Sequence, residues 1–289
     1  MKIYIGLLSF FLCSCQETNS EITTLCKLPK KLKEVSGMQW AKNGGNFFYV
    51  IQDSGNESSV YKVNTKGEQI QELFVNAKNT DWEDLTSDKE GNLYLGDFGN
   101  NDNERKDLSI YKITTTEKVD IIKPKYKVSF YYPEQTDFPP SKKELLYDCE
   151  AFFEQNDFFY LFTKNRSKGF DGTTLIYKIP NKDGHHEAKL LGKYKTGDDY
   201  NNSAITGSAI SPDGSKFVLL SHSKIWLFEN FKSDDFLNGK ISILDLNHYS
   251  QKEAVCFKDN NTLLIADEKD KKTGGNVYEV NLESLKAKP

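Results

Sequence analysis

The sequence lacks the features that mark several common classes of protein. Its 38 lysine and arginine residues against 42 aspartate and glutamate residues give a net charge of −4, so no excess of basic residues is available to bind nucleic acid. There are only 4 histidines and no Cys-x-x-Cys pair, and therefore no zinc-ligand pattern. A Gly-x-Ser-x-Gly elbow, a P-loop and a Gly-x-Gly-x-x-Gly motif are also missing. We therefore expect no nucleic-acid partner and no chemistry that depends on these motifs.

Long apolar runs are equally scarce. The run from Ile3 to Leu12 is too short for a mature membrane-spanning helix, and Lys2 gives it the positive start of an export signal. The four residues that end at Cys15 (Leu-Cys-Ser-Cys) resemble the bacterial lipobox. This resemblance implies a signal peptide over residues 1–14, a lipid on Cys15 and a polar tether over residues 15–20. A plain secretory signal is the alternative.

The lipid sets the expected location. We predict a protein of the bacterial cell envelope, held at the outer membrane on its periplasmic or surface face, with the lipid as its only membrane contact. For the folded part, Cys26, Cys149 and Cys256 remain, and an odd number of cysteines cannot all pair. Cys149 and Cys256 lie in apolar sequence, so we expect small buried thiols there.

What the sequence does contain is five similar segments. Aromatic residues make up 13% of the chain, which favours strands. Each segment begins with a short strand, a turn rich in Gly, Asn and Asp, and a second, apolar strand. A third strand follows, and its sequence recurs almost unchanged. The third strands read Ser59-Val-Tyr-Lys-Val63, Ser109-Ile-Tyr-Lys-Ile113, Leu175-Ile-Tyr-Lys-Ile179, Lys224-Ile-Trp-Leu-Phe228 and Asn276-Val-Tyr-Glu-Val280. This pattern predicts an all-β fold, a β-propeller of five four-stranded blades.

The fourth strands fit the gaps between these segments, at residues 69–75, 126–132 and 189–194. The last segment ends near Leu285 with no room for its own fourth strand, so we predict that the N-terminal stretch from Ile22 to Leu28 completes the last blade. Residues 21–289 then form a single propeller domain, which we expect to be a monomer. A six-bladed ring, with a hidden blade between Thr114 and Leu146, and a β-sandwich are the alternatives.

Two columns of polar residues emerge when the first strands are aligned on their closing apolar residue. Residues two apart in a strand point to the same face, and the first strand of each blade lines the channel, so the ten positions should converge near one mouth. The nearer column is Ser36, Glu83, Glu150, Ser208 and Glu253, and the farther column is Glu34, Asp81, Asp148, Thr206 and Gln251.

The carboxylates in these columns are candidate metal ligands. Converging carboxylates repel one another, so the ring binds a cation, shifts its pKa values or stays hydrated. Oxygen ligands without histidine favour Ca²⁺, with Mg²⁺ as the alternative. The predicted ligands are Glu34, Asp81, Glu83, Asp148, Glu150 and Glu253. In the alternative interpretation these residues cap strand ends and connect neighbouring blades.

The loops after the second strands carry more polar residues, near the same mouth or the opposite one. These are Asp53, Asp97, Asn100, Asn101, Lys164, Asn165, Arg166, His222, Asp267 and Glu268. Lys164 and Arg166 either meet an anionic ligand group or belong to a solvated loop. The candidate catalytic residues are Glu150, Glu253 and His222, the last as a general base or as a hydrogen-bonded structural residue.

Several phrases resemble a broad group of secreted bacterial propellers, which includes phytase-like domains with esterase-like activity and, more distantly, the gluconolactonase type. They are Asp81-Trp-Glu-Asp-Leu85, Gly96-Asp-Phe-Gly-Asn-Asn101, Tyr147-Asp-Cys-Glu-Ala151 and Glu253-Ala-Val255, within a likeness over roughly residues 30–285. The resemblance implies a divalent cation at the channel mouth, with Glu83, Glu150 and Glu253 in the analogous positions. The chain departs from true propeller phytases in lacking a dense Lys/Arg cluster for phosphates.

Two functions follow as hypotheses. In the first, the acidic mouth binds a divalent cation with a small polar ligand above it, and an enzyme of this kind would carry out metal-assisted hydrolysis of an ester, lactone or phosphoester. In the second, a non-catalytic propeller holds a glycan or a protein, and the carboxylates are structural.

Overall fold

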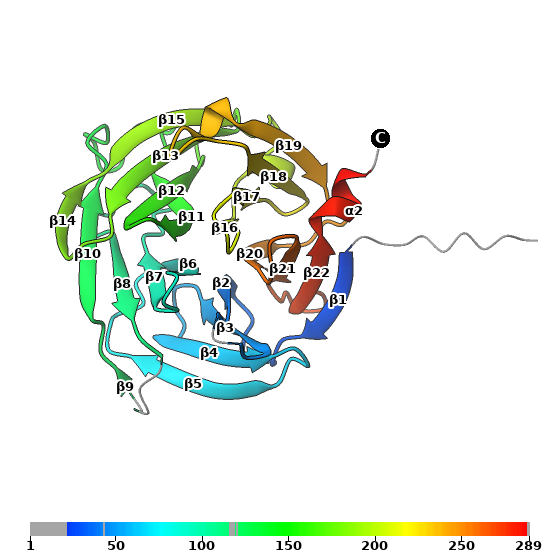
Figure 1. Ribbon diagram of the computed structural model, residues 1–289. Helices are drawn as coiled ribbons and strands as arrows, with labels where there is room; N and C mark the ends of the chain where they lie inside the picture. Colours follow the sequence, from blue (N-terminus) through cyan, green and yellow to red (C-terminus); the bar gives the residue numbers. More distant parts are fainter. Residues whose placement is uncertain (1–21, 43, 116–118, 120, 288–289) are drawn as a thin grey trace, which may run out of the picture.

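Five antiparallel sheets surround a central axis, and each is one blade of a β-propeller (Figure 1). The computed structural model describes residues 22–42, 44–115, 119 and 121–287, so the predicted signal peptide, Cys15 and the tether lie outside the described residues. The prediction of five four-stranded blades is confirmed. The six-bladed alternative is wrong, because the extra length after Thr114 forms a short edge strand, the fourth strand of one blade and a rim loop.

The strands of each blade follow the order that the sequence predicts. Blade 1 contains, from the axis outward, β2 (Val35–Trp40), β3 (Phe47–Gln52), β4 (Ser59–Asn64) and β5 (Gln69–Val75). Blade 2 contains β6 (Trp82–Ser87), β7 (Leu93–Asp97), β8 (Ser109–Ile113) and β10 (Tyr126–Tyr131). Blade 3 contains β11 (Asp148–Gln155), β12 (Phe158–Lys164), β13 (Thr173–Pro180) and β15 (Lys189–Lys195). Blade 4 contains β16 (Gly207–Ile210), β17 (Lys216–Leu220), β18 (Lys224–Glu229) and β19 (Lys240–Asp245).

Blade 5 joins the two ends of the described chain. It contains β20 (Lys252–Phe257), β21 (Thr262–Asp267) and β22 (Asn276–Asn281), and its outer strand is β1 (Ile22–Lys27). β1 runs antiparallel to β22, with Ile22 opposite Val280 and Lys27 opposite Asn276. The predicted closure of the last blade by the N-terminal strand is therefore confirmed, and blade 5 has the same four strands from axis to rim as the other blades.

The segments between the third and fourth strands of blades 2, 3 and 4 contact the preceding blade. β9 (Ile121–Ile122) leaves blade 2 and pairs parallel with β5 of blade 1, while β14 (Gly184–Glu187) leaves blade 3 and pairs parallel with β10 of blade 2. In blade 4 the same segment forms the short helix η1 (Phe236–Asn238), and the Phe236 ring packs on Tyr160 of blade 3. Neighbouring blades are thus tied at their outer edges as well as at the axis.

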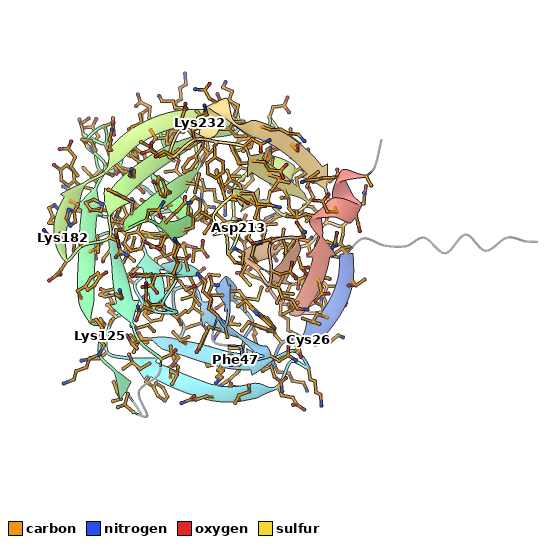
Figure 2. All side chains as sticks on the ribbon, viewed as in Figure 1. Cys26, Phe47, Lys125, Lys182, Asp213 and Lys232 are labelled. Atoms are coloured by element: carbon orange, nitrogen blue, oxygen red, sulfur yellow. The ribbon has the colours of Figure 1, made fainter. Side chains whose placement is uncertain are left out.

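The apolar core is divided into five clusters, one between each pair of neighbouring blades. Because both faces of a blade pack against other blades, the middle strands are apolar along their whole length, as in β17 from Phe217 to Leu220. Trp226 from the recurring third strand is fully buried. Figure 2 shows side chains filling the space between the blades.

Helices contribute little to this fold. α1 (Tyr200–Ser203) and α2 (Leu282–Lys286) are the α-helices of the described residues, and neither has the length or apolar character to cross a membrane. Cys26, Cys149 and Cys256 are buried free thiols, as predicted for the last two.

Candidate metal and ligand site at the channel mouth

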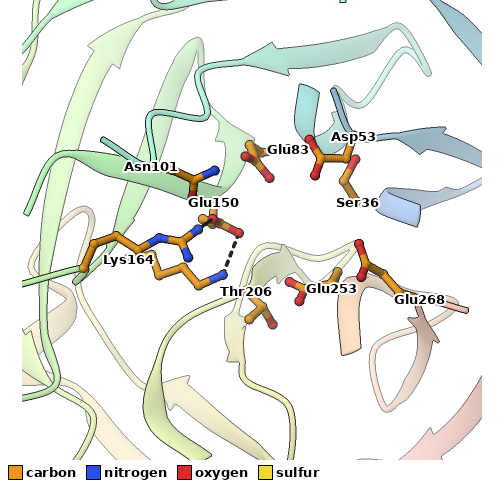
Figure 3. A pocket seen from close by; sticks show the side chains of 10 residues that line it. Ser36, Asp53, Glu83, Asn101, Glu150, Lys164, Thr206, Glu253 and Glu268 are labelled. Carbon is orange, nitrogen blue, oxygen red and sulfur yellow. Dashed lines mark hydrogen bonds and ion pairs between the residues drawn. The ribbon is translucent and has the colours of Figure 1, made fainter. Parts of the chain in front are cut away.

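Polar side chains converge on a cavity of about 400 Å³ at one mouth of the channel (Figure 3). The first strand of each blade begins at this mouth, and the second strand, which is antiparallel to it, ends there. Residues at the start of first strands and residues just after second strands therefore meet. The mouth cavity is lined by Ser36, Asp53, Glu83, Asn101, Glu150, Lys164, Arg166, Thr206, Glu253 and Glu268.

A β-bulge explains why the nearer column of residues faces this cavity. In four of the five first strands the pairing register skips one residue, and the skipped residues are Ser36, Glu83, Glu150 and Glu253. A bulge turns the extra residue out of the regular alternation of the strand and is frequent next to functional sites. β16 has no such shift, and its Ser208 is buried with no hydrogen-bond partner for its hydroxyl among the described residues.

Asp53, Asp81 and Glu83, here called the acidic side of the mouth, form one potential metal site. One carboxylate oxygen from each lies within 4.8 Å of the others. Burial, followed by the neighbouring Asp53, raises the pKa of Asp81 to about 7. Burial, followed by repulsion from Glu150, raises the pKa of Glu83 well above its usual value.

Glu83 is the least satisfied member of the acidic side. Its exposed fraction is 7%, and among the described residues no side chain or backbone group forms a hydrogen bond or an ion pair with its carboxylate. Gly99 packs directly against it, because a Cβ atom there would overlap both Glu83 Oε1 and Asp81 Oδ2. The loop backbone at Gly99 thus lies against two neighbouring carboxylates, and the carboxylate of Glu83 has no partner in the part of the chain that the structure describes.

The opposite side of the mouth is neutralised by two cations. Arg166 Nε contacts Asp148 Oδ2 at 2.6 Å and Arg166 Nη2 contacts Glu150 Oε1 at 2.5 Å, while Lys164 Nζ lies 3.1 Å from Glu150 Oε2. We call Asp148, Glu150, Lys164 and Arg166 the paired side. Burial acts to raise the pKa of Glu150, but Lys164 and Arg166 outweigh it, and the pKa lies below its usual value. Burial and the charge of Glu150 raise the pKa of Asp148 to about 7.

Glu253 and Glu268 form the wall of the mouth that blade 5 contributes. Glu253 Oε1 lies 2.9 Å from His222 Nε2, so His222 reaches the cavity only through this carboxylate. His222 Nδ1 lies 3.4 Å from the hydroxyl of Tyr249. Burial, followed by the charge of Glu253, raises the pKa of Glu268 to about 8.

Some of the column residues connect blades, as the structural interpretation predicts. Ser36 Oγ donates to the carbonyl of Trp82 in the next blade at 2.6 Å, and Thr206 Oγ1 donates to the carbonyl of Lys252 at 2.6 Å. Asp148 Oδ1 accepts the backbone N–H of Asn100 at 2.7 Å. Asp148 therefore has a structural role in addition to its place on the paired side.

The structure separates the predicted metal ligands into groups. Asp81 and Glu83 lie on the acidic side, Asp148 and Glu150 on the paired side, and Glu83 is close enough to both pairs to form a second cluster with Asp148 and Glu150. Glu253 lines the cavity, but it is in neither cluster. Glu34 is exposed and accepts a hydrogen bond from Asn56 Nδ2, and it does not line the cavity formed by the described residues.

Asp53 and Glu268 were absent from the predicted ligand set, although both lie in the loops that the sequence singles out. Their position in the sequence could have identified them. Asp53 directly follows the second strand β3 and Glu268 directly follows the second strand β21, and second strands end at the mouth where first strands begin. In blade 3, Lys164 ends the second strand β12 and Arg166 follows two residues later. Lys164 is buried, Arg166 is partly buried, and both pair with carboxylates instead of forming a solvated loop.

Comparison with known proteins identifies the fold. Neither protein-family models nor curated proteins match the sequence. The PQQ-bound aldose sugar dehydrogenase of Streptomyces coelicolor is similar in structure, with a TM-score of 0.52 and 11% identity over 90% of this chain and 97% of that one. The catalytically inactive virginiamycin B lyase from Staphylococcus aureus, with quinupristin, has a TM-score of 0.42 and 14% identity over 88% of this chain and 68% of that one. At these identities the likeness concerns the fold alone, and the chain is a β-propeller.

Proposed function

We propose that the protein binds a divalent cation, Ca²⁺ in preference to Mg²⁺, on the acidic side of the mouth, with a small polar ligand above it. The observation that carries this proposal is the carboxylate of Glu83, which is buried beside Asp53 and Asp81 without a partner among the described residues. Burial disfavours the bare charge of this carboxylate, and a bound cation offsets that cost, as a proton or water in the cavity also would. The three carboxylates, which each bring an oxygen to within 4.8 Å of the others, supply the hard oxygen ligands that calcium prefers.

The same mouth supports hydrolysis of an ester, lactone or phosphoester. A bound cation would polarise the reacting oxygen. Glu253 faces the cavity with His222 behind it at 2.9 Å, which is the arrangement of a general base and a residue that orients it. In this scheme Glu253 takes a proton from water as the water oxygen adds to the acyl or phosphoryl centre, and the leaving oxygen receives that proton. Glu150 has both oxygens engaged by Arg166 and Lys164, so its part is to hold those two cations in place.

A thermal unfolding series tests cation binding. We expect Ca²⁺ to raise the melting temperature and EDTA to reverse the shift, because an ion that binds only the folded state stabilises it. Glu83→Gln combined with Asp81→Asn should abolish the shift, whereas Glu34→Gln should retain it. A melting temperature that does not respond to Ca²⁺, Mg²⁺ or EDTA would refute the cation site.

Turnover is tested separately with nitrophenyl esters, lactones and phosphoesters in the presence of Ca²⁺. Loss of a general base costs about 10²–10⁴-fold in rate, so Glu253→Gln should lose most of the activity and Glu34→Gln none. Absence of turnover, with the calcium response intact, would leave the second function, a non-catalytic binding propeller. The engagement of Glu150 and the bonds that connect blades through Ser36 and Thr206 favour that alternative.

The location in the cell remains part of the proposal. A lipid on Cys15 would hold the propeller at the outer membrane through residues 15–20. Replacement of Cys15 by Ala should then release the protein from the membrane fraction, and a variant that stays there would contradict the lipid anchor.

A further inference from the structure

A second cavity, of about 450 Å³, opens beside the mouth on blade 5. It is formed by the connection between β19 and β20 and by the loop between β21 and β22. Glu268 lines both this second cavity and the mouth cavity, and Figure 3 shows its side chain directed toward the mouth. The two cavities are therefore neighbours that share Glu268 as a lining residue, and we call the pair of cavities the trough.

The floor of the second cavity is a fixed set of polar groups. Tyr278 donates its hydroxyl proton to Asp267 Oδ2 at 2.7 Å, and Asp267 Oδ1 accepts the backbone N–H of Asn276 at 2.7 Å. Asn276 Nδ2 lies 3.1 Å from the Tyr278 hydroxyl. Groups that are already bonded to one another keep their positions when a ligand arrives, so this floor is organised in advance.

A buried lysine holds the wall between the cavities. Lys252 Nζ donates to the carbonyls of His222 and His248, at 2.9 and 2.7 Å, and lies 3.0 Å from Ser250 Oγ. Its ammonium group thereby fastens the segment that carries Tyr249 to the turn that carries His222. Lys252 is fully buried, so its role is to position this wall and not to contact a ligand.

Tyr249 lies at the top of the wall. Its side chain is 56% exposed, although its hydroxyl is within 3.4 Å of His222 Nδ1 and its ring meets the His222 ring edge-on at 5.7 Å. A large aromatic ring that is held in one orientation yet left open to solvent is unusual away from a binding surface. It lines the second cavity, and His222, which it contacts, is bonded in turn to Glu253 of the mouth cavity.

The charges of the second cavity restrict the ligand there. The two cations that line the mouth cavity, Lys164 and Arg166, are already engaged by carboxylates. No lysine or arginine is among the described residues that line the second cavity, whereas Asp267, Glu268 and Asp270 are. Anionic ligands are therefore disfavoured. Carboxylates accept hydrogen bonds from hydroxyl groups, and the face of an aromatic ring, which is electron-rich, attracts the C–H bonds of a sugar ring.

We infer that the trough binds a neutral saccharide chain of at least two sugar units, one in the mouth cavity and the next across Tyr249 in the second cavity. This inference deepens the proposed function, because it names the polar ligand of the mouth and rests on that ligand being bound there. It adds a subsite on blade 5, with Tyr249 as the stacking surface and Glu268 and Asp270 as hydroxyl acceptors.

The experiment is a calorimetric titration of the calcium-loaded protein with neutral gluco-oligosaccharides and chitin oligosaccharides of one to six units. We expect affinity to rise from one unit to two or three and then to level off. Tyr249→Ala should weaken binding of the longer oligosaccharides by about tenfold and leave binding of the single sugar unchanged, while Tyr249→Phe retains the affinity. Thr273→Trp, which fills the second cavity from its rim, should abolish the dependence on length.

Tyr131→Ala is the matched control, because Tyr131 is 39% exposed but lies on the outer strand of blade 2. The calcium-induced melting shift of every variant separates this inference from the proposed function. If that shift persists and no neutral oligosaccharide binds, or if Tyr249→Ala binds all lengths as well as the unaltered protein, the saccharide subsite is refuted. Binding of spermidine or of polygalacturonate in place of the neutral chains would refute it as well.

Discussion

The acidic side and the paired side of the mouth begin from nearly the same sequence and end in opposite electrostatic states. Both have an Asp-x-Glu pattern where a first strand begins: Asp81, just before β6, with Glu83 in one case, and Asp148 with Glu150 in the other. The difference lies at the end of the second strand of the same blade and in the loop after it. In blade 3 the last residue of β12, Lys164, and the loop residue Arg166 contact the carboxylates, whereas in blade 2 the loop after β7 places Gly99 there, which has no side chain to offer. A repeat therefore predicts where carboxylates meet but not whether they are neutralised.

The largest expected effect comes from removing one of the two cations of the paired side, Arg166. Arg166→Met leaves Asp148 and Glu150 buried without their shared partner, and breaking a buried pair in this way costs about 3–5 kcal/mol of the free energy of unfolding. Urea denaturation measures the loss. Lys195→Met is the matched control, since the Lys195–Asp171 ion pair is 69% and 48% exposed and should change stability by less than about 1 kcal/mol. A small loss for Arg166→Met would show that the two sides do not differ as described.

The second effect sharpens the comparison from the acidic side. Gly99→Ala would place a methyl group where Glu83 Oε1 now lies, so the carboxylates or the loop must move, at a cost of roughly 1–3 kcal/mol. We also expect the calcium-induced melting shift to shrink. Gly207→Ala is the control, because the nearest atom to a new Cβ there is 3.4 Å away. Equal unfolding curves for the two variants would mean that Gly99 is not needed for the close approach of Asp81 and Glu83.

The third effect is a dependence on pH. The pKa of Glu268 is about 8 in the folded protein and 4.5 as its ordinary value, so between these values the folded state holds a proton that the unfolded state has lost. Stability should therefore fall as the pH rises from about 4.5 to 8, and Glu268→Gln should make this fall shallower. Melting temperatures across that range test the slope, with the exposed Glu57→Gln as the control. If Glu268→Gln leaves the slope unchanged, the pH dependence of stability comes from a different titratable group.

Most of the fold could be predicted because it depends on features that repeat. The recurring third strand, with its aromatic residue at Tyr61, Tyr177 or Trp226, marks each blade, and the missing fourth strand of blade 5 identifies β1 as its replacement. The parallel pairings of β9 and β14 could not be predicted. They involve strands of 2 and 4 residues, too short for any periodic pattern to show.

The site was predicted less completely, and for a different reason. The column alignment finds Glu83, Glu150 and Glu253 because a bulge occurs at the same place in their strands. It also includes Glu34, which precedes β2 and turns outward to Asn56. Asp53 belongs to no column, because its place at the mouth follows from the antiparallel return of the second strand and not from similarity between blades.

The pairing of β1 with β22 also has a consequence for how the chain folds. Ile22 and Val280 become neighbours although nearly the whole sequence separates them, so this contact closes a very long loop and forms late. Until β22 has been made, β1 has no strand to add to and blade 5 cannot be completed. During synthesis, the early strand must therefore be kept from pairing with other chains, because an unpaired edge is a template for aggregation.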